Sequence, residues 1–208
     1  HSFPTRRSSD LCPILSLNYR LNRLIVTGRY EFRSKLNIPN DTKALDVKAA
    51  PALQSQLAAV APMAAPYQDG VKTRYDMPGL LSLAVGYEFV PKKFRGTLEY
   101  HWFDDKNAKM QGDRQKELKH GTQEILVGLE YDVNKVLTVS AGAQRTDYGL
   151  SDEYQANTSF ACDSYSVGLG AAINATSHLR FNLGYFCSIY KDYTRETQYM
   201  SIPLTETY

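Results

Sequence analysis

Alternation of apolar and polar residues is the feature that most restricts how this chain can fold. In the segment that begins at Leu24, one set of residues alternates with another: Leu24, Val26, Gly28, Tyr30 and Phe32 against Ile25, Thr27, Arg29, Glu31 and Arg33. Successive side chains of a β-strand point to opposite faces. The period of two therefore predicts a strand with one apolar face and one mostly polar or charged face.

The same period recurs along the chain and predicts eight strands in all. It is clear over Leu81–Phe89, Ile125–Val133 and Leu179–Tyr185, and weaker over Leu15–Leu21, Phe94–Trp102, Leu137–Arg145 and Tyr165–Ile173. Strands of about ten residues have the length that a tilted strand needs to cross a bilayer. We therefore expect an all-β fold, an antiparallel meander of about eight strands that forms part of a transmembrane β-barrel.

The connections between these segments alternate between short and long. The short ones contain the turn formers Asn and Pro and lie at Asn22–Arg23, Val90–Lys93, Asn134–Val136 and Asn174–Ser177. The long ones are polar and cover Asn37–Thr73, Asp104–Gly121, Gly149–Asp163 and the residues from Lys191 onward. Outer-membrane barrels have short periplasmic turns and long extracellular loops, so this sorting favours such a barrel over a soluble sandwich.

Composition excludes several other classes of protein. Lys and Arg number 24 and Asp and Glu 22 among 208 residues, so the net charge of +2 gives no sign of a nucleic-acid partner. With 43% hydrophobic and 22% charged residues, the chain is not disordered overall. The mean hydropathy of −0.40, without any apolar run of eighteen residues, excludes a transmembrane helix but not a membrane barrel.

The alternation does not say which face points outward, and a soluble sheet with a solvated polar face is the alternative. Tyrosines on the apolar face favour the membrane, because their amphipathic rings suit a membrane–water girdle; they are Tyr19, Tyr30, Tyr87, Tyr100, Tyr131 and Tyr185. The opposite face carries charges of both signs that can pair and line a polar lumen: Arg29, Glu31, Arg33, Glu88, Arg95, Glu99, Glu124, Glu130 and Arg180.

The first long connection contains a segment of different character. Leu53, Leu57 and Val60 have the i, i+4, i+7 spacing of an amphipathic helix. Pro51 suits the first helical position and Pro62 ends the pattern. We expect one short helix over 51–61 in an extracellular loop.

No catalytic or metal-binding pattern is present in the sequence. The four histidines are His1, His101, His120 and His178, and none has the spacing of a zinc site. Gly168 and Gly170 lack a following helix, so a nucleotide site is not expected; glycines there give the strand room to curve or another group room to approach. We expect no enzyme activity, no metal and no cofactor.

Several longer runs resemble a known family. They are Asp69–Leu83 (DGVKTRYDMPGLLSL), Val85–Lys92 (VGYEFVPK), Leu98–Lys109 (LEYHWFDDKNAK), Glu124–Gln155 and His178–Phe186 (HLRFNLGYF). Together they resemble the FadL/TodX-like outer-membrane transporters of hydrophobic compounds such as long-chain fatty acids, in the form found in Bacteroidota. The resemblance implies a fourteen-stranded barrel plugged by an N-terminal hatch, of which this chain carries later strands.

The resemblance also implies a function. The protein would be a monomer of the cell outer membrane that passively transports fatty acids, contacts membrane lipid and lipopolysaccharide, and binds no nucleic acid. In the family, loop helices offer the ligand an apolar landing site, which makes Leu53, Leu57, Val60 and Met63 the candidate substrate-binding residues. The alternative is an eight-stranded structural or adhesive outer-membrane barrel whose loops bind partners.

Both ends of the chain have an unusual sequence. Residues 1–11 (HSFPTRRSSDL) resemble a translated sequencing adapter, so we expect a tail without function there and a partial barrel domain over 12–208. Residues 200–208 (MSIPLTETY) are polar and contain Pro203, which predicts a loop.

Overall fold

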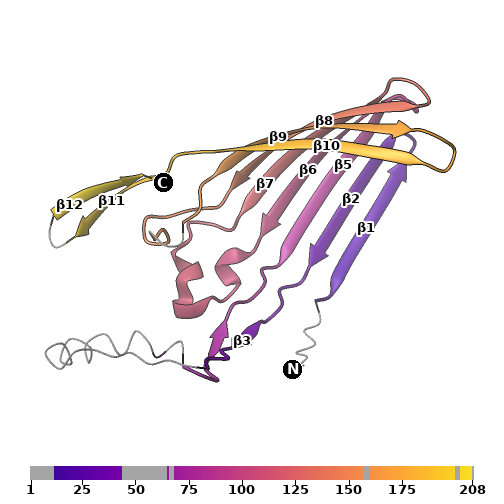
Figure 1. The fold of residues 1–208 in the computed structure, drawn as a ribbon. Coiled ribbons are helices and arrows are strands. Elements are labelled where there is room, and N and C mark those ends of the chain that lie inside the picture. Colours follow the sequence, from indigo (N-terminus) through magenta and orange to yellow (C-terminus); the bar gives the residue numbers. More distant parts are fainter. Residues whose placement is uncertain (1–11, 44–64, 66–67, 157–159, 200–201, 208) are drawn as a thin grey trace, which may run out of the picture.

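A computed structural model describes residues 12–43, 65, 68–156, 160–199 and 202–207 of the chain. Its main feature is one antiparallel sheet in the order β1-β2-β5-β6-β7-β8-β9-β10, a meander of eight strands (Figure 1). The expected fold class is thus confirmed. The strands are β1 (Ile14–Leu21), β2 (Leu24–Glu31), β5 (Leu80–Val90), β6 (Phe94–Phe103), β7 (Gln123–Asp132), β8 (Leu137–Asp147), β9 (Ser164–Asn174) and β10 (Arg180–Tyr190).

Short turns and long connections separate to opposite ends of this sheet, as the sequence predicts. All four short turns lie at one end, which we call the turn end, and the long connections lie at the other, the loop end (Figure 1). Asn22 (φ 52°) and Lys92 (φ 56°) adopt the left-handed conformation at two of the turns. Asn tolerates this conformation better than most residues, which suits it to a tight turn.

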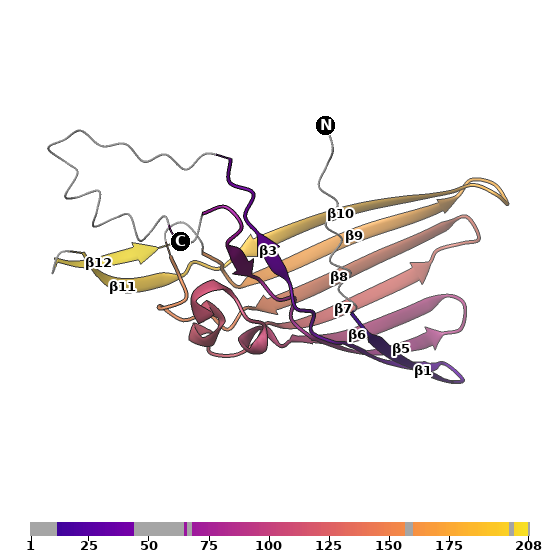
Figure 2. The same cartoon turned by 90° about the horizontal axis from the view of Figure 1, so that it is seen from below.

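The sheet is curved, and β1 and β10 form its two edges within the described residues (Figure 2). Register places the two alternating sets of each strand on opposite faces. In β7, Ile125, Val127 and Leu129 lie on one face, while Leu126 and Gly128 lie on the other. We call these the outer face and the concave face.

Exposure on the two faces is the reverse of what a soluble protein shows. Val127 and Leu129 of the outer face are 47% and 45% exposed, whereas Glu124 and Glu130 of the concave face are less exposed. Among the described residues, the buried hydrophobic side chains are Ala108, Leu118, Leu150 and Ala172. Three of these four belong to long connections, so the sheet itself has almost no conventional core.

Aromatic side chains gather on the outer face near the turn end. Tyr87, Phe89 and Phe94 contact one another with ring centroids 5.3 and 5.1 Å apart, and Phe94 lies 6.3 Å from Tyr131. A register shift between Glu88 and Val90 forms a bulge at Phe89. All six tyrosines that the sequence assigns to the apolar face lie on the outer face by register.

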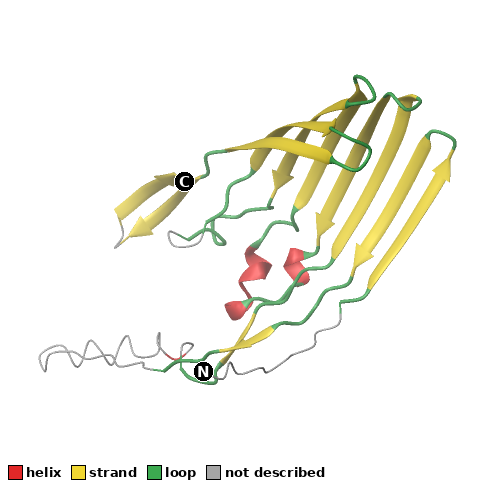
Figure 3. Ribbon diagram, turned by 45° about the vertical axis from the view of Figure 1, so that its right-hand side comes forward, coloured by secondary structure: helices red, strands yellow, loops and turns green. Residues whose placement is uncertain are grey.

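The long connections pack into a layer at the loop end. It contains the small hairpin β3 (Asn37–Pro39) and β4 (Lys72–Arg74) and two 3₁₀ helices, η3 (Asp105–Asn107) and η4 (Gln111–Glu117), drawn red in Figure 3. Gly121 is required here, because a Cβ on it would overlap the carbonyl oxygen of Phe103. The helix expected over 51–61 lies outside the described residues. No described helix is long and apolar enough to cross a bilayer.

One prediction for the C-terminal part was wrong. The last strand of the sheet ends at Tyr190, directly before the connection expected from Lys191 onward. The expected loop over 200–208 contains β12 (Ile202–Thr207), which pairs with β11 (Thr194–Tyr199). An ion pair across that hairpin, Arg195 Nη2 to Glu206 Oε2 at 2.6 Å, joins residues that lie directly opposite each other, which local sequence reasoning does not reveal.

Candidate functional site

The candidate binding residues named from the sequence, Leu53, Leu57, Val60 and Met63, all lie outside the described residues. The described residues instead bring together two hollows. One lies within the loop layer, and the other lies against the concave face of the sheet.

The loop-layer cavity has a volume of about 310 Å³ and lies between three long connections. Each connection supplies apolar or aromatic side chains to its wall. The apolar and aromatic lining residues are Tyr75, Pro78, Ala108, Met110, Leu118, Tyr148, Leu150, Tyr154 and Ala161. Sequence reasoning missed them, because they come from separate loops without any periodic pattern.

The carboxylates at this cavity are satisfied by neighbouring donors. Asp76 is fully buried and accepts two hydrogen bonds from the Arg74 guanidinium, at 3.0 and 2.9 Å. The backbone N–H groups of Leu36 and Lys109 also donate to it, each at 3.3 Å. The hydrogen bond from Arg74 is the main reason that the pKa of Asp76 lies below its usual value. Asp105 accepts the N–H of Thr122 at 2.7 Å.

Tyr148 and Tyr154 of the cavity keep their protons at neutral pH. Burial raises the pKa of both Tyr148 and Tyr154 above the usual value for a phenol. The Arg114 guanidinium lies 4.8 Å from the ring centroid of Tyr154 and also donates to the Tyr154 carbonyl oxygen. Since Asp76 is paired with Arg74, Asp105 accepts a backbone N–H, and most of the lining is apolar or aromatic, the cavity suits an apolar ligand.

Two buried glutamines fix the loops around the cavity. The amide oxygen of Gln115 accepts the N–H of Met110 at 2.8 Å. Gln155 donates to the Ala161 carbonyl oxygen at 2.6 Å and accepts the Ala161 N–H at 3.1 Å. Because these amides supply hydrogen bonds to backbone groups that no strand pairs, they hold the loops in shape.

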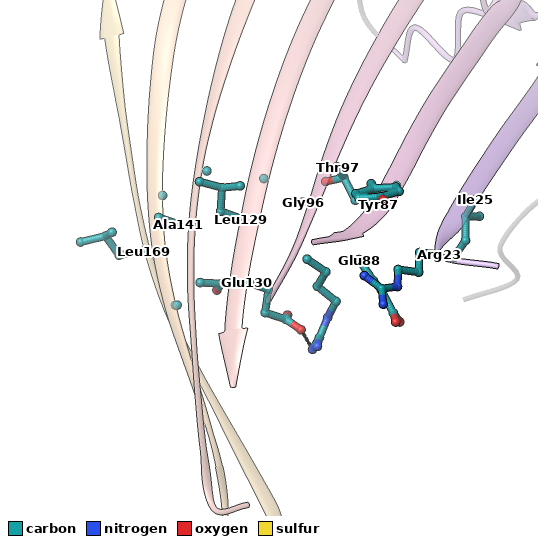
Figure 4. A pocket seen from close by; sticks show the side chains of 18 of the residues that line it. Arg23, Ile25, Tyr87, Glu88, Gly96, Thr97, Leu129, Glu130, Ala141 and Leu169 are labelled. Atoms are coloured by element: carbon teal, nitrogen blue, oxygen red, sulfur yellow. Dashed lines mark ion pairs between the residues drawn. The ribbon is translucent and has the colours of Figure 1, made fainter. Parts of the chain in front are cut away.

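The concave face holds the larger hollow, of about 810 Å³ (Figure 4). Register aligns a row of small residues across five neighbouring strands at its centre: Gly86, Thr97, Gly128, Gly142 and Gly168. Gly168 and Gly170, which the sequence analysis singled out, both lie on the concave face by register. The complete row depends on strand register, which the sequence does not reveal.

Charged residues line the concave face on both sides of this row of small residues. Toward the turn end, Arg95 forms ion pairs with Glu130 and Asp132, the second at 2.8 Å, and Figure 4 shows the pair made by Glu130. Toward the loop end, His101 lies between Glu124, with Nδ1 to Oε2 at 3.1 Å, and Glu99, with Nε2 to Oε2 at 3.6 Å. The predicted pairing of opposite charges on the polar face is therefore confirmed.

Comparison with known proteins rests on structure. No protein-family model and no curated protein matches the sequence. The fold matches the crystal structure of a Pseudomonas aeruginosa FadL homologue with a TM-score of 0.69 and 15% identity, over 90% of this chain and 46% of that one. It also matches the CymD monoaromatic hydrocarbon channel with a TM-score of 0.51 and 13% identity, over 86% and 47% of the two chains.

These likenesses establish the fold. The eight strands and their loop layer have the architecture of a FadL-like barrel wall, and this chain spans about half the length of each solved structure. CymD is a channel for monoaromatic hydrocarbons by its description, and neither match is described as an enzyme.

Proposed function

We propose that this chain is part of an outer-membrane β-barrel that lets hydrophobic compounds cross the membrane. The observation that carries the proposal is the largely apolar and aromatic cavity in the loop layer, at the loop end of a sheet whose apolar face is exposed. A cavity of this kind gives an apolar compound a place to leave water before it reaches the concave face.

The outer face supports the membrane part of the proposal. Its side chains are apolar along each strand, with aromatic rings near the turn end. Exposed apolar surface of this extent is unfavourable in water, whereas a lipid-facing barrel wall has this composition. The polar concave face then lines the route of the ligand.

Long-chain fatty acids are the substrates that the family resemblance implies. CymD, described as a hydrocarbon channel, has a related fold and is consistent with hydrophobic cargo of other shapes. Leu53, Leu57, Val60 and Met63 would add apolar contact area for the ligand if the amphipathic segment forms a landing site. The transport itself needs no cofactor, because only graded binding sites are involved.

Titration of a fluorescent long-chain fatty acid against the protein in neutral detergent tests this function. Ala161→Phe places a ring in the loop-layer cavity and is expected to weaken binding by about tenfold, or roughly 1.4 kcal/mol. Ala143→Phe is the matched control, because Ala143 is exposed on the outer face of β8. It is expected to leave the affinity unchanged.

The two variants together separate the possible outcomes. Equal affinities of Ala161→Phe and Ala143→Phe would show that the ligand does not bind in the loop-layer cavity. A wild-type protein that binds no apolar probe would favour the structural or adhesive alternative. Leu57→Asp, compared at equal folded content, tests whether the predicted landing-site segment contributes to the affinity.

A further inference from the structure

We propose a second binding site, at the turn end of the concave face, that holds the carboxylate of an amphipathic compound. This site rests on the proposed function and adds a chemical requirement to it, namely an anionic head group. A hollow of about 650 Å³ lies there between three of the short turns. Its charged lining residues are Lys92, Lys93, Arg95, Lys135, Arg180 and Asp132.

Positive charge dominates this turn-end hollow. The single carboxylate of its lining, Asp132, is occupied by Arg95 at 2.8 Å and by the Thr138 hydroxyl at 2.6 Å. Arg95 also pairs with Glu130 and so contributes little net charge. Lys92 and Lys135 form no ion pair with any described residue, and Arg180 has only a longer-range attraction to Asp132, so the hollow keeps a cationic excess for an incoming anion.

The turn that carries Lys135 is held in place by hydrogen bonds. The Asn134 side-chain oxygen accepts the N–H groups of Val136 and Leu137, both at 2.8 Å. The Asn174 amide donates to the Lys135 carbonyl oxygen at 3.2 Å, and the Asn174 N–H donates to Val136 at 2.8 Å. A fixed backbone lowers the entropic cost of ordering the lysine around a ligand.

Register shows that the turn-end hollow opens to the concave face and not to the outer face. Asp132 pairs with Thr138, and Arg180 pairs with Asn174, all on the concave side. Lys93 is different, because its ammonium lies 5.6 Å from the ring of Tyr131 on the outer face. An anion would therefore reach Lys135 and Arg180 from the concave side of the sheet.

The loop layer and the turn end of the concave face thus differ in the ligand chemistry that they favour. The loop-layer cavity is mostly apolar and aromatic, whereas the turn-end hollow has a cationic excess. An apolar body with a carboxylate head satisfies both sites. A neutral hydrocarbon suits only the first, because it has no charge to pair with the cations of the second.

The test compares a fluorescent long-chain fatty acid with the fluorescent fatty alcohol of the same length. Both are titrated into the whole chain in nanodiscs of zwitterionic lipid at low salt. The double variant Lys135→Gln/Arg180→Gln is expected to bind the acid about tenfold more weakly and the alcohol as the wild type does. Lys116→Gln is the matched control, because this exposed loop lysine pairs with Asp113 at the opposite end.

Each other outcome overturns the proposal. Unchanged affinity for the acid, or equal losses for acid and alcohol, would show that the cations do not hold a carboxylate, while the proposed function would stand. Binding of neither probe by the wild type would overturn the proposed function and this site with it. If anionic phosphatidylglycerol in the nanodisc removes the difference between wild type and variant, the hollow holds a membrane lipid instead.

Discussion

At the scale of single residues, Asp76 links separate parts of the loop layer. Its carboxylate bonds to Arg74 on one side and to the backbone of Leu36 and Lys109 on the other. These partners come from the β2–β5 and β6–β7 connections, both of which line the loop-layer cavity. A buried acceptor with this many donors stabilises the shape of the cavity.

The substitution Asp76→Asn removes the charge and is expected to loosen these loops. Amide exchange at Leu36 and Lys109 should become roughly three- to tenfold faster at neutral pH. Because the pKa of Asp76 is lowered from 3.8 in the folded protein, the wild type keeps this stabilisation above that value and loses it as the pH falls further. Exchange measured from pH 7 down to pH 2 should show this acid step only in the wild type; a step of equal size in the variant would exclude Asp76 as its source.

At the scale of single strands, β7 offers a direct test of the two faces. Val127 lies on the outer face beside Leu98 and Ala143, and its neighbour Leu126 lies on the concave face beside Glu99 and Gln144. Val127→Arg is expected to destabilise the protein in lipid by about 2–4 kcal/mol if the site is near the bilayer midplane. Leu126→Arg should cost much less, since Glu99 can pair with it.

Denaturant unfolding in lipid vesicles measures both variants. The test asks which of the two variants is less stable. The comparison is direct, because the residues are adjacent and the introduced side chain is the same. If Leu126→Arg proved the more harmful change, the outer face would not be the lipid-facing one.

At the scale of the whole molecule, the distribution of apolar side chains determines which solvent the fold tolerates. The described part has only four buried hydrophobic residues, and the outer face of the sheet is covered by nothing in that part. We expect a monodisperse protein in detergent micelles that aggregates when the detergent is diluted below its critical micelle concentration. Light scattering across the dilution checks this, and a chain that stays monodisperse in plain buffer would contradict the membrane assignment.

The sequence by itself determined the strands, because the information needed is local. The pleat forces neighbouring side chains to opposite faces, so Val127 and Gly128 reveal their faces without knowledge of any partner strand. Asn22 marks a turn for an equally local reason, its tolerance of a positive φ. The turn positions and the eight strands of the main sheet then follow, as does the segregation of short and long connections.

Tertiary structure decided what lies next to what, and the candidate sites consist of such neighbours. The row of small residues on the concave face forms only when five strands pair in their observed register. The loop-layer cavity forms only when three connections meet. Ala108 and Tyr154 belong to different loops and carry no periodic signal, so nothing in either segment indicates the other. The hairpin of β11 and β12 was missed because its cross-strand ion pair, Arg195 to Glu206, becomes a neighbour contact only after the chain has turned back.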